Sequence, residues 1–186
     1  MSVPNSVLEK AAKIKLLVSD VDGVFTDGSI YVGSSGELKR FSVSDGMGVA
    51  LARHTSLAIA LLSGRHSDAT TIRAEELGIG DHVYQGYLNK NVALKAILEQ
   101  FGVEKSQTAY IGDDYVDIPV MREVGLAFAV PNARDAVKKV ADYTLETHGG
   151  DGAVTEVIEL ILDARGELQQ ALDEMERKVY MEGEDG

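Results

Sequence analysis

The sequence predicts an α/β protein with a doubly wound parallel sheet, a β-hairpin insertion after the first strand and a C-terminal helix. Short apolar runs, such as residues 16–18, 57–62 and 108–111, alternate with longer segments typical of helices. These runs end in polar or glycine-containing clusters, as buried parallel strands do. Strands that alternate with helices are joined by right-handed crossovers, so helices are expected on both faces of the sheet.

A lead-in and a hairpin flank the first strand. Residues 1–13 are expected to be weakly helical. Residues 28–45 hold two β-prone segments on either side of Gly33-Ser34-Ser35-Gly36, a pattern that predicts a β-hairpin. The later strands are expected at residues 57–62, 83–84, 108–111, 126–130 and 143–144. The helices are expected at residues 49–54, 66–77, 89–101, 116–124, 133–140 and 153–162.

Residues 166–186 predict an acidic C-terminal helix. Leu168, Leu172, Met175 and Val179 are spaced by four, three and four residues, which is typical of an amphipathic helix. Its apolar side could pack on its own domain or on a partner helix, and the sequence leaves both open. A chain of this length is expected to form one domain, residues 1–186.

Composition excludes several classes of function. The net charge of −12 argues against a surface for nucleic acid or for an anionic membrane. With no cysteine in the chain, disulfides, thiolate metal sites and a cysteine nucleophile are excluded. No basic segment precedes an apolar one at the start, and the longest apolar run, residues 57–62, is too short to span a bilayer. We therefore expect a cytoplasmic protein with no membrane or nucleic-acid partner.

Polar clusters follow successive strands at the point where each ends. The carboxyl ends of parallel strands meet at one edge of a sheet, where such folds bind ligands. Each cluster alone would more often be a helix cap or a solvated turn. Together they place carboxylates, a hydroxyl and an ammonium group at one crevice. The clusters are Asp20 with Asp22, Ser63, Lys90, and Asp113 with Asp114.

This combination suits phosphoryl transfer from a phosphate monoester. A carboxylate can attack phosphorus and form an aspartyl-phosphate, and a second carboxylate can protonate the leaving alcohol and then activate water. A serine and a lysine can hold the phosphoryl oxygens as charge shifts in the transition state. Attack by one anion on another also calls for a hard divalent cation with oxygen ligands, and Mg²⁺ is favoured over zinc.

The same residues resemble the motifs of the haloacid dehalogenase superfamily of phosphohydrolases. Those motifs are Asp20-Val-Asp22-Gly-Val, Ser63-Gly-Arg65, Lys90 and Gly112-Asp113-Asp114-x-x-Asp117. The similarity extends over most of the chain to a capless subgroup that acts on ulosonate phosphates. The segments that carry it are Thr26-Asp-Gly-Ser-Ile-Tyr, Gly36-Glu, Phe41-x-Val-x-Asp45-Gly46, Tyr84-Gln-Gly86 and Gly149-Gly-x-Gly-Ala-Val.

The resemblance implies a role for each of these residues. Asp20 would be the nucleophile and a metal ligand, and Asp22 the general acid/base, with its carbonyl on Mg²⁺. Asp113 would complete the protein ligands. The residues implied in phosphoryl or substrate binding are Ser63, Lys90, Asp22, Asp45, Gly46, Gly64, Arg65 and Arg73. For Asp114 and Asp117 two interpretations stay open: support for the ligands from behind, or ordinary acids at a helix start. The resemblance also implies a homotetramer in which the hairpins assemble and each subunit helps to close a neighbour's site.

The implied substrate is the sugar phosphate 3-deoxy-D-manno-octulosonate 8-phosphate, used in lipopolysaccharide precursor synthesis. Ser44, Ala50 and Asp151 depart from the subgroup, which commonly has arginine at these positions. A nonulosonate 9-phosphate is the alternative, although phosphatases for it usually have an acid where Arg65 stands. Arg65 and Arg73 lie eight residues apart, about two helical turns, and are expected to face one side and hold the substrate carboxylate.

Three alternatives remain. One of the two arginines could merely pair with a surface acid such as Glu76. The chain could be a phospho-receiver signalling module, which should carry its acceptor aspartate after the third strand and not after the first. It could also be an inactive homologue that only assembles, although all five catalytic side chains are present.

Overall fold

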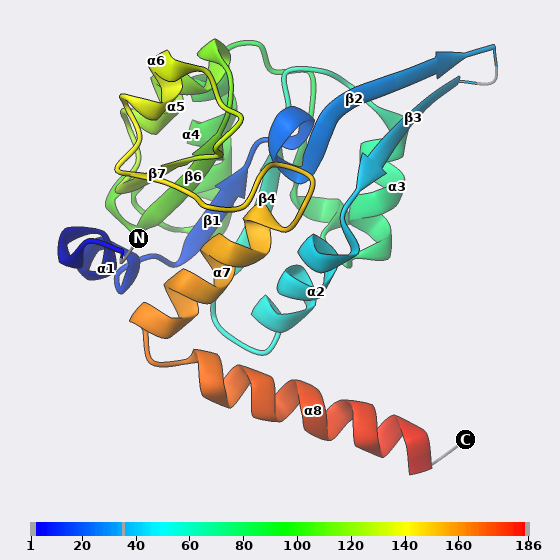
Figure 1. The fold of residues 1–186 in the computed structure, drawn as a ribbon, viewed down its shortest axis with the longest axis vertical. Coiled ribbons are helices and arrows are strands. Elements are labelled where there is room, and N and C mark those ends of the chain that lie inside the picture. Colours follow the sequence, from blue (N-terminus) through cyan, green and yellow to red (C-terminus); the bar gives the residue numbers. More distant parts are fainter. Residues whose placement is uncertain (1–2, 35, 185–186) are drawn as a thin grey trace.

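The computed structural model describes residues 3–34 and 36–184, with side chains as far as residue 178 (Figure 1). Six parallel strands form the main sheet in the order β5-β4-β1-β6-β7-β8. The strands are β1 (Leu16–Ser19), β4 (Ala58–Leu62), β5 (Val83–Tyr84), β6 (Thr108–Gly112), β7 (Leu126–Ala129) and β8 (Tyr143–Thr144). The helices are α1 (Asn5–Ala11), α2 (Val43–Ala52), α3 (Asp68–Glu76), α4 (Lys90–Phe101), α5 (Ile118–Met121), α6 (Asp135–Lys138), α7 (Ala153–Ala164) and α8 (Leu168–Glu184).

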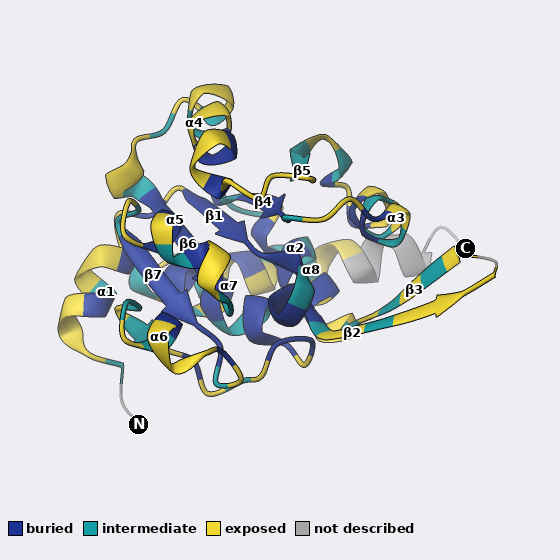
Figure 2. Cartoon of the chain, turned by 90° about the horizontal axis from the view of Figure 1, so that it is seen from above, coloured by how far each residue is buried: buried dark blue, intermediate teal, exposed yellow. Residues whose placement is uncertain are grey.

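The central strands are covered on both faces. Every residue of β1, β6 and β7 is buried, which explains why these segments are continuously apolar and do not alternate (Figure 2). Helices α1, α2 and α7 pack together on one face, and α4 and α5 lie against the other (Figure 1). The predicted fold class is confirmed.

The order of the strands determines where a ligand site can form. From β1 the chain proceeds to β4 on one side, whereas from β6 it proceeds to β7 on the other. The connections therefore diverge between β1 and β6, and the crevice outside the carboxyl ends of these two strands is a topological switch point. Asp20 follows β1 and Asp113 follows β6, so both aspartates lie at this crevice.

The predicted hairpin is present, but it is shorter at its C-terminal end. Strands β2 (Thr26–Gly33) and β3 (Gly36–Phe41) form a separate antiparallel pair that projects from the body (Figure 1). Helix α2 begins at Val43, six residues earlier than expected, because the Ser42 side chain caps it by accepting a hydrogen bond from the Ser44 N–H. The expected hairpin boundary at residue 45 was therefore wrong, and its last residues belong to α2.

One further helix differs from the prediction, and another bears on an alternative that the sequence left open. The helix expected at residues 116–124 is a 3-10 turn, Tyr115–Asp117, followed by the short α5 with a proline in its first turn. Helix α8 contacts α2 and α7, and Leu168, Ala171 and Met175 pack on the core. Leu172, predicted to lie on the apolar side, is instead 42% exposed, so the described part of that side packs only partly on its own chain. Val179 lies outside the described side chains. No helix in the part of the chain that the structure describes is long and apolar enough to cross a membrane.

Candidate active site

The turn after β1 brings the first aspartate against the loop after β6. Asp20 follows the strand and is 5% exposed, and the chain then turns through residues 21–25. Gly23 adopts a φ of +97°, and a Cβ at this position would collide with the Asp113 carboxylate. Only glycine tolerates both the left-handed backbone and the close approach, so Gly23 allows the two loops to meet.

A buried lysine joins this pair of loops. Lys90, the first residue of α4, places its Nζ atom 2.6 Å from Asp20 Oδ1 and 2.6 Å from Asp117 Oδ1. The same ammonium group donates to the Tyr110 hydroxyl at 3.1 Å. We call Asp20, Asp113, Asp117 and Lys90 the carboxylate cluster. The structure thus places three of the predicted positions, Asp20, Lys90 and Asp113, close together.

The sequence left open whether Asp114 and Asp117 support the metal ligands or are ordinary acids at a helix start. The contacts of Asp117 favour the supporting role. Its Oδ1 accepts from Lys90 and from the Tyr110 hydroxyl at 2.6 Å, and its Oδ2 accepts from the N–H groups of Asp113 and Asp114 at 2.9 and 3.0 Å. Both oxygens are thus engaged and the residue is fully buried. Asp114 instead caps the 3-10 turn and pairs with Arg134 at the surface.

The carboxylate cluster contains three acids and one lysine, so it carries excess negative charge when its acids are ionised. Burial and the nearby Asp117 charge raise the pKa of Asp20 to about 7. Burial and the Asp20 charge raise the pKa of Asp113 to about 8. Burial lowers the pKa of Lys90, but the Asp20 and Asp117 carboxylates outweigh it and the net pKa is raised. One lysine therefore does not neutralise the acids around it.

The cluster fits a hard divalent cation. Carboxylate oxygens of Asp20, Asp113 and Asp117 lie within 4.8 Å of one another. Asp113 Oδ1 is shielded from solvent, and no hydrogen-bond donor for it is found among the described residues. Because Asp117 is already satisfied, the oxygens free to bind a cation are those of Asp20 and Asp113. An all-oxygen set of this kind suits Mg²⁺.

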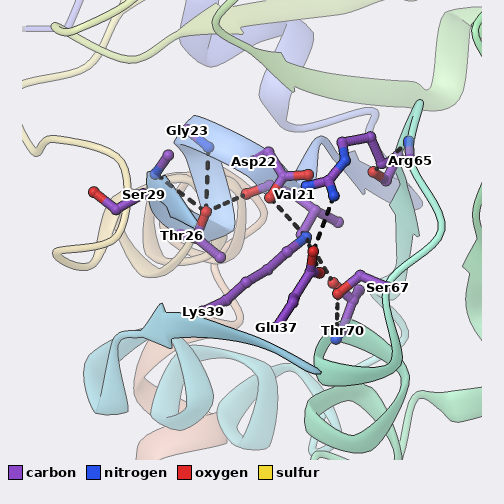
Figure 3. A network of polar contacts seen from close by, with 12 residues as sticks. Val21, Asp22, Gly23, Thr26, Ser29, Glu37, Lys39, Arg65, Ser67 and Thr70 are labelled. Atoms are coloured by element: carbon purple, nitrogen blue, oxygen red, sulfur yellow. Dashed lines mark hydrogen bonds and ion pairs between the residues drawn. The ribbon is translucent and has the colours of Figure 1, made fainter. Parts of the chain in front are cut away.

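Asp22 lies beside the cluster and faces the hairpin (Figure 3). Its Oδ1 is 2.7 Å from the Nζ atom of Lys39 on β3. Lys39 also lies 3.8 Å from Glu37, and Glu37 pairs with Arg65 at 2.9 Å. We call Asp22, Glu37, Lys39 and Arg65 the hairpin network. Arg65, expected to bind substrate, therefore has a protein partner in this conformation.

Ser63 and Gly64 lie at the end of β4, the neighbour of β1. The Ser63 side chain is buried, and its hydroxyl oxygen accepts a hydrogen bond from the Arg65 N–H at 3.1 Å. A Cβ at Gly64 would make only ordinary contacts, the nearest with Leu88. The roles of Ser63 and Gly64 in phosphate binding stay predictions. Their position at the same edge of the sheet as Asp20 supports these roles.

The remaining predicted residues lie on α2 and α3. Asp45 is fully buried, and its Oδ1 accepts from the N–H groups of Val154 and Thr155 at the start of α7. Burial raises the pKa of Asp45 to about 6, against those hydrogen bonds. The carboxylate therefore fastens α2 to α7, so its predicted contact with substrate has no support from this geometry. Gly46 lies against the Arg73 guanidinium.

Arg73 takes the partner named as the alternative in the sequence. Its Nη1 atom pairs with Glu76 at 2.8 Å, and Nη2 donates to the Ser42 carbonyl at 3.4 Å. The side chain is 17% exposed.

The chain is similar to a known family of hydrolases. The model of the haloacid dehalogenase-like hydrolases matches residues 53–158. The 3-deoxy-D-manno-octulosonate 8-phosphate phosphatase KdsC of Escherichia coli K12 is 44% identical over 170 residues, covering 91% of this chain and 90% of that protein. The chain belongs to the haloacid dehalogenase-like hydrolases. A phospho-receiver module should carry its acceptor aspartate after the third strand. Asp20 follows the first strand, so this alternative is set aside.

Solved structures of these hydrolases are similar over nearly the whole chain. The 3-deoxy-D-manno-octulosonate 8-phosphate phosphatase of Yersinia pestis matches with a TM-score of 0.87 at 43% identity, covering 90% of each chain. The Moraxella catarrhalis enzyme, in complex with magnesium ion, phosphate ion and a KDO molecule, matches with a TM-score of 0.88 at 40% identity, covering 93% of this chain and 99% of that one.

Sequence reasoning missed two residues of this hydrolase site. Tyr110 lies in the middle of β6, where the sequence pattern indicates an ordinary core aromatic residue, and only its contacts with Lys90 and Asp117 give its hydroxyl a role. Lys39 lies in a hairpin strand that alternates exposed and half-buried residues, so nothing in the pattern indicates a side chain that is 0% exposed.

Proposed function

We propose that this hydrolase removes the phosphate from 3-deoxy-D-manno-octulosonate 8-phosphate through an aspartyl-phosphate on Asp20. The observation that carries the proposal is the contact of Asp20 with Lys90 and Asp113 at the switch point of the sheet. Relatives that are 44% identical bear the name of this phosphatase, which supports the same substrate here.

The carboxylates of Asp20 and Asp113 would hold Mg²⁺, and the resemblance adds the carbonyl of Asp22. When bound, it supplies positive charge that offsets the repulsion between the Asp20 carboxylate and a dianionic phosphate. Lys90 contributes a second positive charge beside Asp20. The Moraxella catarrhalis enzyme, in complex with magnesium ion, supports this choice of metal.

In the first step an Asp20 oxygen attacks phosphorus and the bond from phosphorus to the sugar oxygen breaks. Asp22 gives its proton to that oxygen, so the sugar leaves as an alcohol. Ser63 and Lys90 bind the phosphoryl oxygens while charge develops on them.

In the second step Asp22, now a carboxylate, takes a proton from water. The resulting hydroxide attacks phosphorus, the bond from phosphorus to Asp20 breaks, and inorganic phosphate leaves. Asp20 is again a free carboxylate and Asp22 is again protonated. Atoms and protons therefore balance over the cycle.

The test is a phosphate-release assay on matched substrates, each with Mg²⁺ and with EDTA. It compares 3-deoxy-D-manno-octulosonate 8-phosphate with a nine-carbon nonulosonate 9-phosphate. We expect the larger kcat/KM with the eight-carbon substrate, and a large loss of turnover on both substrates with EDTA. A preference for the nine-carbon substrate overturns the sugar and keeps the chemistry, whereas no turnover of any phosphomonoester favours the assembly-only alternative.

We also propose a homotetramer built through the hairpins. An isolated two-stranded hairpin is marginally stable in water, and this one exposes Tyr31, Val32 and Leu38, with Val32 at 82%. We expect light scattering to give a tetramer mass at micromolar concentration, and the double variant Val32→Asp, Leu38→Asp to lower it. An active wild-type monomer would refute the assembly. Separately, we propose that the protein is cytoplasmic.

A further inference from the structure

The side chain of Lys39 crosses from the hairpin to the turn that carries the proposed general acid. Its Nζ atom lies 2.7 Å from Asp22 Oδ1, and the side chain is 0% exposed (Figure 3). It is the partner that the described residues give to the Asp22 carboxylate. The Asp22 side chain is 22% exposed. The ammonium group can donate to Oδ1 whether Asp22 is ionised or carries its proton on Oδ2, so this short contact restricts both side chains to one geometry.

Lys39 is itself held from two directions. Its ammonium group donates to the Thr70 hydroxyl of α3 at 3.3 Å and lies 3.8 Å from Glu37 on its own strand. Glu37 is in turn held by the Ser67 hydroxyl and by Arg65 (Figure 3). The ammonium group is therefore fixed between the hairpin and α3, and this fixes the side of the crevice on which Asp22 must point.

We infer that Lys39 is a positioning residue for Asp22, so that the inserted hairpin sets the geometry of proton transfer to the leaving alcohol. The inference rests on the proposed function, since it needs Asp22 to act as the general acid. The mechanism gives the ammonium group no contact with the reacting atoms. Its effect should therefore be felt only in steps that use the Asp22 proton.

Leaving groups separate this role from a general loss of structure or of phosphate affinity. A sugar alcohol must be protonated as it leaves, whereas p-nitrophenolate leaves without a proton. The ratio kcat/KM covers binding and the steps up to release of the alcohol, so it does not include the later attack by water. General acid catalysis contributes about 10²–10⁴-fold, and a misplaced acid loses part of that.

The experiment compares Lys39→Met and Lys39→Arg with wild type in Mg²⁺, on the sugar phosphate and on p-nitrophenyl phosphate. We expect Lys39→Met to lose roughly tenfold or more in kcat/KM on the sugar phosphate and less than about threefold on the aryl phosphate. Lys39→Arg keeps the charge and should recover part of the loss, again on the sugar phosphate alone. If Lys39→Met fails to fold, the same comparison with Lys39→Arg decides.

Arg40→Met is the matched control. Arg40 is the next residue on β3, and it pairs with Asp151 and Asp27, away from Asp22. This variant removes a hairpin cation without touching the acid, so both substrates should keep wild-type values within about threefold.

A double variant tests whether Lys39 acts through Asp22. In an Asp22→Asn background, Lys39→Met should cost nothing further on the sugar phosphate, since the acid it positions is already gone. Independent, multiplying losses would overturn the inference, as would equal losses on both substrates in the single variant while wild type is active. An inactive wild type would instead overturn the proposed function, and the inference with it.

Discussion

Two groups of charges lie on either side of the Asp20–Asp22 turn. The carboxylate cluster is buried and the hairpin network is partly exposed, and the two are balanced differently. The carboxylate cluster has three acids and one lysine. The hairpin network has two acids and two bases. In the cluster the pKa values of Asp20 and Asp113 are raised, with burial as the largest cause. In the network the pKa of Glu37 is lowered, chiefly by the hydrogen bond from Ser67.

This difference shows which group needs something from outside the chain. A network with equal numbers of acids and bases can pair its own charges and act as a fixed support. A cluster with excess carboxylate must hold protons or bind a cation, and proton binding would disable a nucleophile. The local charge count therefore distinguishes the place for Mg²⁺ from the place for a structural contact, although both lie at one crevice.

The largest effect is expected from removing the nucleophile of the cluster. Asp20→Asn should lower phosphate release by at least roughly three orders of magnitude, because the amide cannot attack phosphorus. The fold should remain, since the amide oxygen can still accept from Lys90. Asp114→Asn is the control, because Asp114 caps a turn and should leave activity near wild type. Substantial turnover by Asp20→Asn, with deamidation excluded by mass spectrometry, would falsify the assignment.

Removal of the cation should come next in size. Exhaustive EDTA should lower turnover by at least about a hundredfold, because the cluster lacks the charge needed to receive a dianion. Added Mg²⁺ should restore it. Full activity after chelation, with metal content checked by elemental analysis, would contradict the claim that the carboxylate cluster needs a bound cation for turnover.

A smaller effect is expected at the exposed end of the hairpin network. Arg65→Ala should raise KM for the octulosonate 8-phosphate by about tenfold to a hundredfold, through loss of a charged contact worth roughly 1.5–3 kcal/mol. KM for p-nitrophenyl phosphate, which lacks a carboxylate, should change little. Equal increases for both substrates would assign Arg65 to the fold or to the phosphate, as its pairing with Glu37 allows.

The smallest effect is on stability and concerns the support of the cluster. Asp117→Ala should lower the free energy of unfolding by about 1–3 kcal/mol, because its four donors lose their acceptor. Relief of repulsion with Asp20 opposes part of this loss. Urea unfolding of the metal-free protein measures the balance, and an unchanged midpoint would contradict the supporting role.

The sequence was sufficient for the parts of the site that depend on strand ends. Asp20, Ser63 and Asp113 each follow a short apolar run, and Lys90 begins a helix with clear periodicity. Parallel topology then brings them to one edge, so local patterns predicted a three-dimensional cluster.

The parts that the sequence could not give depend on side chains that meet through tertiary packing. The burial of the Lys39 side chain depends on its contacts with Asp22 and Thr70, which lie outside its own strand, and no periodicity encodes those contacts. The Asp45 carboxylate accepts hydrogen bonds from the start of α7, which lies far along the chain, so its role depends on the packing of α2 on α7. The early start of α2 depends on one serine cap that was not recognised.

The most direct test of the charge imbalance is the stability of the wild-type protein against pH, with and without Mg²⁺. The pKa values of Asp20 and Asp113 are raised to about 7 and about 8, so near neutral pH the folded metal-free chain holds protons that the unfolded chain has lost. Its free energy of unfolding should therefore fall as pH rises from about 6.5 to about 8.5, by up to about 1.4 kcal/mol per pH unit for each proton held. Saturating Mg²⁺ should remove most of this fall, and Asp113→Asn should reduce it. A metal-free stability that does not change over this range, together with no stabilisation by Mg²⁺, would contradict the account.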